Sequence, residues 1–194
     1  FGAVGDGAHI KNVIVDNTCS VTITGDDTKG YAAGIVGATV GAGKVTIENC
    51  GSEADITVPG PNAAGILGVD DLGQMVVTIK NCYNTGKIVG GRESAGIAGW
   101  LGNRSVIVNS WNSGAVEGLD GGNTFFRNGA AKASNCYETI GTQVTAVTDE
   151  QVGNGQLKDM LNAGAKAEYW YQNVGTDNHP MLDFEYIIQG IEEV

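Results

Sequence analysis

Two pairs of adjacent aspartates are the first candidates for chemistry: Asp26, Asp27, Asp70 and Asp71. Each pair lies in a glycine-bounded turn, where carboxylate oxygens could fold around a hard cation, so calcium is the one cofactor we consider. A glycosidase needs two carboxyl groups facing each other across a sugar. These pairs fall at different positions in the repeat described below, so we expect no catalytic site from them, and turn aspartates are common.

Three aromatic residues directly follow an Asn-Cys or Asn-Ser pair: Tyr83, Trp111 and Tyr137. Neighbouring side chains on a strand point to opposite faces, so if the Cys or Ser points inward the ring points outward. We therefore expect an exposed aromatic strip, which could stack on a glycan or a peptide. The first expectation for such a strip is nevertheless that it packs on itself or under a loop, because rings in contact stabilise each other.

The four cysteines, Cys19, Cys50, Cys82 and Cys136, could form two disulfides in a secreted protein. They follow Asn or Thr at a similar place in each repeat, and Ser110 replaces a cysteine without leaving one unpaired. We therefore predict a buried ladder of reduced thiols. There is no C-x-x-C motif and the two histidines are far apart, so zinc is not expected.

The positions of these residues follow from an internal repeat with two independent anchors. The cysteines at 19, 50 and 82 are 31 and 32 residues apart, and Asn109-Ser110 and Asn135-Cys136 continue the series at 28 and 26. The pattern Gly-Ile-x-Gly recurs at 34–37, 65–68 and 96–99. A fixed period of this length is typical of stacked-repeat proteins. Its units are 13–43, 44–75, 76–104, 105–132 and a partial unit at 133–147.

Short β-branched runs, bounded by Gly, Asn and Asp, recur in every unit. They predict an all-β fold, a parallel β-helix (β-solenoid) of four to five coils of about 30 residues each. Neighbouring coils would lie about 4.8 Å apart. A single coil cannot bury its own apolar face, so stability must come from stacking and from capped ends.

The composition changes at residue 148, and we divide the chain into repeats at 1–147 and a C-terminal capping segment at 148–194. Thr148 and Gln151 fit a capping box, which predicts one short helix at 148–152. A second is expected at about 155–162, capped by Asn154 and ended by 162–164. The aromatic stretch at 169–171 should help this small α/β cap cover the open end of the solenoid.

The Gly-Ile-x-Gly units resemble the GLUG repeat of bacterial surface and secreted proteins, with Ile in place of Leu. The fourth unit departs, with 125–129 in that place. The segment containing Trp170-Tyr171-Gln172 and Gly175-Thr176-Asp177 resembles the closing module of secreted bacterial repeat proteins. The resemblance implies a right-handed β-helical domain that is adhesin-like or accessory to a larger secreted protein. It implies no enzymatic activity.

Composition narrows the class of partner. The chain has 194 residues, 31 of them glycine, and a formal net charge of −11. An acidic chain disfavours nucleic acid and anionic membranes, and no membrane-spanning run is present. The chain begins in mid-repeat, so we expect a monomeric piece of a longer protein at the cell surface or outside the cell, with a glycan or a cell-surface protein as partner. The alternatives are a polysaccharide lyase or hydrolase, or the substrate-recognition domain of a larger secreted enzyme.

Overall fold

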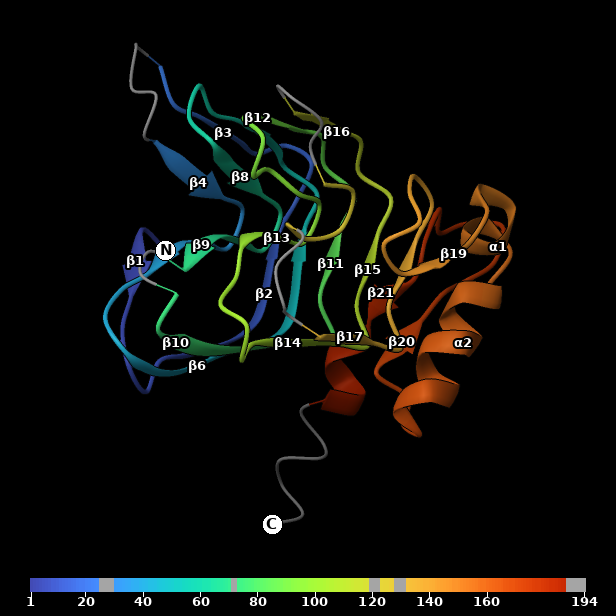
Figure 1. The fold of residues 1–194 in the computed structure, drawn as a ribbon. Helices are drawn as coiled ribbons and strands as arrows, with labels where there is room; N and C mark the ends of the chain where they lie inside the picture. Colours follow the sequence, from blue (N-terminus) through green and yellow to red (C-terminus); the bar gives the residue numbers. More distant parts are fainter. Residues whose placement is uncertain (25–29, 71–72, 119–122, 128–131, 188–194) are drawn as a thin grey trace.

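The computed structural model describes residues 1–24, 30–70, 73–118, 123–127 and 132–187. It is a parallel β-solenoid of about four turns, which confirms the predicted fold class (Figure 1). Every strand of one coil pairs in parallel with its counterpart in the next coil, so residues in the same place of successive units form rows.

Each coil has a flat side, which we call the floor, followed by a corner and a second side, which we call the wall. The floor consists of β2 (His9–Val15), β6 (Gly43–Ser52), β10 (Met75–Lys80), β14 (Val106–Val108) and β17 (Lys132–Ser134). The wall continues from the ends of β2 and β6 through β11 (Tyr83–Asn84), β15 (Trp111–Asn112), β18 (Tyr137–Glu138) and β19 (Thr145–Ala146).

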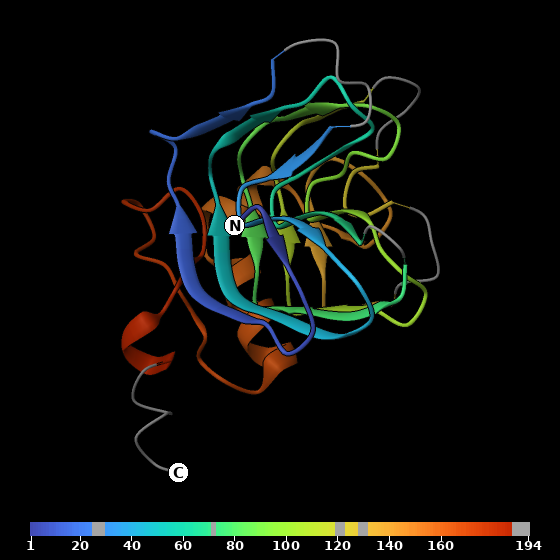
Figure 2. The same cartoon turned by 90° about the vertical axis from the view of Figure 1, so that its left-hand side faces the viewer.

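Three further sets of strands complete each coil. The roof is formed by β3 (Ser20–Thr22), β7 (Asp55–Thr57), β12 (Ile88–Gly90) and β16 (Val116–Gly118). A two-stranded pair follows, β4 (Tyr31–Ala33) with β8 (Asn62–Ala64). The chain then returns through β1 (Ala3–Val4), β5 (Val36–Thr39), β9 (Leu67–Asp70) and β13 (Ala98–Trp100). Viewed down the stack, the sides enclose the core (Figure 2).

An asparagine turns the chain at the corner between floor and wall in every coil. These residues have positive φ, between 49° and 59°: Asn12, Asn49, Asn81, Asn109 and Asn135. Asparagine tolerates this left-handed conformation better than other residues that carry a side chain. Their amides also form a ladder through the stack, since the amides of Asn49 and Asn81 are hydrogen-bonded at 2.8 Å and those of Asn81 and Asn109 at 2.7 Å.

The residue after each corner asparagine points into the core. Cys50, Cys82 and Cys136 are buried free thiols, and each Sγ donates to the carbonyl two residues earlier at 3.2 Å. Ser110 makes the same bond through Oγ at 2.9 Å. A hydroxyl therefore replaces a thiol here without leaving a polar group unpaired, as the reduced ladder requires.

Cys19 does not belong to this ladder, and the prediction for it was wrong. Val13 is the partner of Cys50 in the register of β2 and β6, whereas Cys19 is exposed just before β3. The corner asparagine of this coil is Asn12, 37 residues before Asn49. The first coil is therefore longer than the others, and aligning the cysteines placed its corner too late.

The first glycine of each Gly-Ile-x-Gly unit makes room for a buried polar side chain of the wall. A Cβ added to Gly65 would overlap the side chain of Asn84, and one added to Gly96 would overlap Asn112. Both asparagines are fully buried, and the Asn84 amide donates to Asn112 at 2.9 Å. This motif is therefore a requirement of packing, because interiors are close-packed.

The C-terminal segment contains α1 (Asp149–Gly153), α2 (Gln156–Ala165) and the hairpin β20 (Trp170–Tyr171) with β21 (Met181–Leu182). Thr148 forms the predicted capping box with Gln151. The second helix differs from the prediction: Gly155 is its N-cap, and it continues to Ala165, where Lys166 adopts a left-handed conformation. Asn162 therefore lies within the helix and does not end it. Its side-chain amide bonds the backbone C=O and N–H of Trp170 at 2.8 and 3.0 Å.

Candidate functional site

The three aromatic residues chosen from the sequence do form one row on the outer side of the wall. Tyr83 pairs with Trp111, and Trp111 pairs with Tyr137, in the register of β11, β15 and β18. The rings of Tyr83 and Trp111 are stacked, with centroids 5.5 Å apart and an interplanar angle of 6°. Gly51 precedes them in the row, and its missing side chain leaves space that the Tyr83 ring occupies.

This row is not exposed as a binding strip would be; it packs on itself and under another segment, which confirms the first expectation for it. Tyr83 and Trp111 are 0 % exposed and Tyr137 is 8 % exposed. The C-terminal segment covers them and shares a hydrophobic cluster with them that includes Val152, Leu157, Leu161, Trp170 and Leu182. The Trp170 ring meets Tyr83 edge-on at 6.1 Å. Figure 1 shows α2 and the β20–β21 hairpin beside the strands that carry the row.

Polar contacts involving Glu53 and His179 lie where the C-terminal segment meets the wall. The Tyr83 hydroxyl donates to Oε1 of Glu53 at 2.7 Å. The centroid of the His179 ring is 5.6 Å from that of Tyr83 and 5.5 Å from that of Trp111. Burial, together with the carboxylate of Glu53, raises the pKa of Tyr83, so its hydroxyl stays protonated and donates. Nε2 of His179 is 3.9 Å from Glu53 Oε1, so a protonated imidazole would add an ion pair between segment and wall.

The carboxylates proposed for calcium fall into two groups. Asp26, Asp27 and Asp71 lie outside the described residues. Asp70 is fully buried, and its Oδ1 accepts from the Thr39 hydroxyl at 3.1 Å. Burial raises the pKa of Asp70, while the Thr39 hydroxyl and backbone N–H groups of Met75, Gly102 and Gly73 act against that shift. Thr39 is the register partner of Asp70 in the neighbouring coil, so this hydrogen bond ties the two coils together.

No group of three or more His, Cys, Asp or Glu side chains that could hold a metal ion occurs among residues 1–24, 30–70, 73–118, 123–127 and 132–187. In the same part of the chain, no helix has the length and apolar character needed to cross a bilayer.

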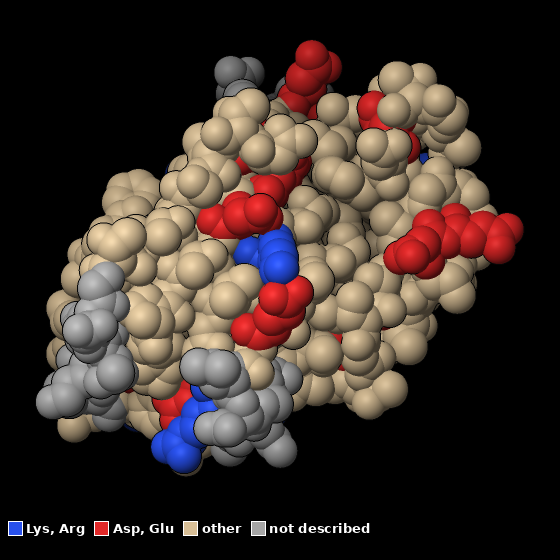
Figure 3. All heavy atoms as spheres, turned by 90° about the horizontal axis from the view of Figure 1, so that it is seen from above, with Lys and Arg blue, Asp and Glu red and all other residues tan. Residues whose placement is uncertain are grey.

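Ionic groups on the roof and on the return side occur as small local pairs. On the roof, Lys87 pairs with Glu117 at 2.8 Å, and its backbone N–H donates to Asp55. On the return side, Arg127 pairs with Glu93 at 3.0 Å. Seen from above, most of this face is uncharged, with separate small groups of acidic and basic side chains (Figure 3).

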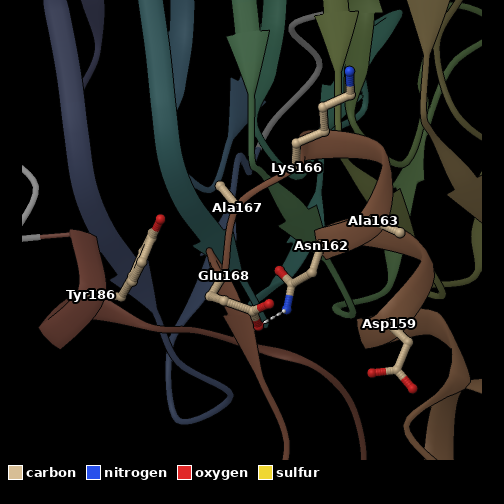
Figure 4. A pocket seen from close by; sticks show the side chains of 7 residues that line it. All are labelled: Asp159, Asn162, Ala163, Lys166, Ala167, Glu168 and Tyr186. Carbon is tan, nitrogen blue, oxygen red and sulfur yellow. Dashed lines mark hydrogen bonds between the residues drawn. The ribbon is translucent and has the colours of Figure 1, made fainter.

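A cavity of about 440 Å³ opens beside the C-terminal end of α2 (Figure 4). It is lined by Asp159, Asn162, Ala163, Lys166, Ala167, Glu168 and Tyr186. Asn162 already donates to Glu168 at 3.0 Å and to Trp170, so the amide is committed to holding the segment together. Figure 4 shows Lys166 pointing away from the two carboxylates, so the charged groups do not converge on one point.

No protein-family model, curated protein or solved structure matches this chain.

The residues that the sequence marked as chemically interesting mostly hold the fold together. The aromatic row binds the C-terminal segment, the thiols bond backbone carbonyls, and burial raises the pKa of Cys136 to about 12, which keeps it unreactive. Sequence reasoning missed the corner asparagines as a ladder, although their recurrence before each Cys or Ser was the visible signal. It also missed the charges of the floor, which only the strand register brings together.

Proposed function

We propose that this chain is a non-enzymatic repeat module of a cell-surface or secreted protein, adhesin-like or serving as a spacer, with a glycan or a protein as its partner. The observation that carries the proposal is that its polar and aromatic residues contact their own counterparts in the next coil. The amide ladder at Asn49, Asn81 and Asn109 is the clearest case. Such contacts make a rigid stack whose length grows with the number of coils.

An enzyme on the same fold would need a different arrangement. A polysaccharide hydrolase places two carboxyl groups across one sugar. The carboxylates described here serve local purposes: Glu53 accepts from Tyr83, Asp70 accepts from Thr39, and Glu117 pairs with Lys87. These uses support a module that binds or spaces, since each of these three carboxylates contacts a structural partner through at least one oxygen.

The test is incubation of the full chain with soluble neutral and acidic polysaccharides, with the chain length of each polysaccharide followed by light scattering. The proposal predicts that chain lengths match those in a parallel sample of heat-unfolded protein. Shortening that requires folded protein would contradict it and would favour the polysaccharide-active alternative.

A further inference from the structure

The outer face of the floor collects cations in a chain that is acidic overall. Side chains of β6 alternate, so Val45 and Ile47 are buried while Lys44, Thr46 and Glu48 face outward. The strand register then places further cations on the same face. Outward-facing Lys and Arg residues of the floor and its approach are Lys11, Lys44, Lys80, Arg104 and Lys132.

The register fixes how these cations are distributed. Lys11 and Lys80 flank Glu48 in one row. In a second row, His9 is at one end and Lys132 is at the other. The five strands that these rows cross span roughly 19 Å, at about 4.8 Å per step.

Arg104 belongs to the same face, just ahead of β14. It lies two residues before Val106, and its guanidinium donates to the carbonyl of Gln74 at 2.9 Å. That bond holds the charge beside the start of β10. Cations therefore lie at the β2 end of the first row, at the β17 end of the second row, and beside the rows.

Most of these cations have no carboxylate partner. Within the described part of the chain, Lys11, Lys44, Arg104 and Lys132 form no ion pair, whereas on the other faces all Lys and Arg except Lys166 do. The chain has 22 acidic residues and 11 Lys and Arg, so partners are plentiful. Four unpaired cations on one face are therefore a distinct feature of that face and not a consequence of composition.

The acidic groups near this face are already engaged. Glu48 forms an ion pair with Lys80, and its Oε1 is 2.6 Å from Nε2 of His9. Burial opposes its ionisation, but the Lys80 and His9 contacts hold the pKa of Glu48 below its ordinary value. Asp6, at the edge, accepts from the backbone N–H of Lys44 at 2.8 Å. Glu48 is therefore compensated by its ion-pair partners, while Lys11, Lys44, Arg104 and Lys132 keep charges that a ligand can pair with.

The centre of the face suits a sugar chain better than a nucleic acid. Between the cations lie hydroxyl and small apolar side chains, including Thr46, Thr78, Val106 and Ser134. Threonine and serine hydroxyls can donate to and accept from sugar hydroxyls. The outward positions of the described floor strands carry no Phe, Tyr or Trp, the residues on which single-stranded bases stack.

We propose that the outer face of the floor binds a linear acidic polysaccharide, whose carboxylate or sulfate groups pair with Lys11, Lys44, Arg104 and Lys132. The polysaccharide lies flat on the sheet, with its hydroxyl groups against the threonines. This proposal rests on the proposed function, because a spacer or adhesin-like module would present this face to surrounding glycans. Binding weakens as salt is added, since the charges are exposed and screened.

The experiment titrates the full chain with oligomers of polygalacturonic acid and, separately, with dextran sulfate, neutral dextran and single-stranded DNA. The test variant is Lys44→Glu with Lys132→Glu, both exposed and unpaired. The matched control is Lys87→Glu with Lys166→Glu, which changes the net charge equally but lies off the floor. We expect the floor variant to bind at least one acidic polymer about tenfold more weakly and the control variant to stay within about twofold.

Four outcomes would overturn the proposal. They are the absence of binding to both acidic polymers at low salt, equal losses in the two variants, equal binding of neutral dextran, and tighter binding of single-stranded DNA than of either polymer. The DNA result would assign the face to nucleic acid. Circular dichroism checks that both variants fold. The length of the bound polymer is followed in the same samples, so shortening would count against the proposed function while weak binding counts against this inference alone.

Discussion

At the scale of single residues, the corner asparagine has two roles that most other side chains could not combine. Its backbone takes a left-handed conformation, which costs most L-residues about 1–2 kcal/mol. Its amide both donates and accepts, so it can bond the asparagines above and below it, as Asn81 does with Asn49 and Asn109. The cysteine or serine that follows the corner asparagine points into the core in four coils, because the chain turns at the same place in each of them.

Two substitutions of Asn81 separate these roles. Asn81→Gly keeps the left-handed conformation but breaks the ladder, leaving buried amide groups unpaired at a cost of about 1–3 kcal/mol. Asn81→Ala loses the ladder and adds backbone strain, so we expect it to lower the free energy of unfolding by about 1 kcal/mol more than Asn81→Gly does. Urea unfolding of both variants measures this difference. Equal losses would show that the conformation of the corner is not strained, and a neutral glycine variant would show that the ladder contributes nothing.

The sequence allowed part of this to be predicted. The recurrence of Asn before a Cys, together with the glycine motif, located the corners of the later coils. It misplaced the first, because Val13 occupies the place of a cysteine there and any small apolar residue can fill that site. A single residue type is therefore a weaker anchor than the backbone conformation that the asparagine provides.

At the scale of elements, a glycine on one side of the coil faces a larger buried side chain on another side. This fit helps to keep the strands of successive coils in register. The wall carries buried polar side chains, such as Asn84, and the return side carries the glycine that faces each of them, such as Gly65. In the fourth coil Phe126 pairs with Ala98, so the motif is lost while the pairing continues. The glycine motif could be recognised from the sequence, but its reason could not, because the side chain it accommodates lies in a different strand.

Gly65→Ala tests this close contact. The added Cβ would overlap Asn84, and overpacking of a filled core costs about 1–3 kcal/mol. Gly153→Ala is the control, since no atom lies within 4 Å of its added Cβ and the residue is helical. That change should raise stability by about 0.4–1 kcal/mol, because alanine can adopt this backbone conformation and restricts the unfolded chain. Thermal unfolding of the two variants should therefore shift in opposite directions, and a neutral Gly65→Ala would contradict the packing argument.

At the scale of the whole molecule, the C-terminal segment decides what the wall can do. The alternation of strand residues correctly predicted that Tyr83, Trp111 and Tyr137 form one row facing outward from the coil. It could not predict that the row would be covered, because the covering residues come from distant parts of the chain, such as Trp170 and Leu182. Surfaces left uncovered, above all the cationic floor, are then the ones open to a partner.

The measurement that tests this account most directly is the free energy of unfolding of Trp111→Ala in the full chain. The indole is fully buried between the wall and the C-terminal segment, so the account predicts a loss of about 3–5 kcal/mol. Tyr171→Ala on the exposed side of β20 is the control, and its loss should stay within about 0.5 kcal/mol. A Trp111→Ala protein as stable as the parent would contradict the account. It would mean that the C-terminal segment does not pack on the aromatic row and that the row is a free surface.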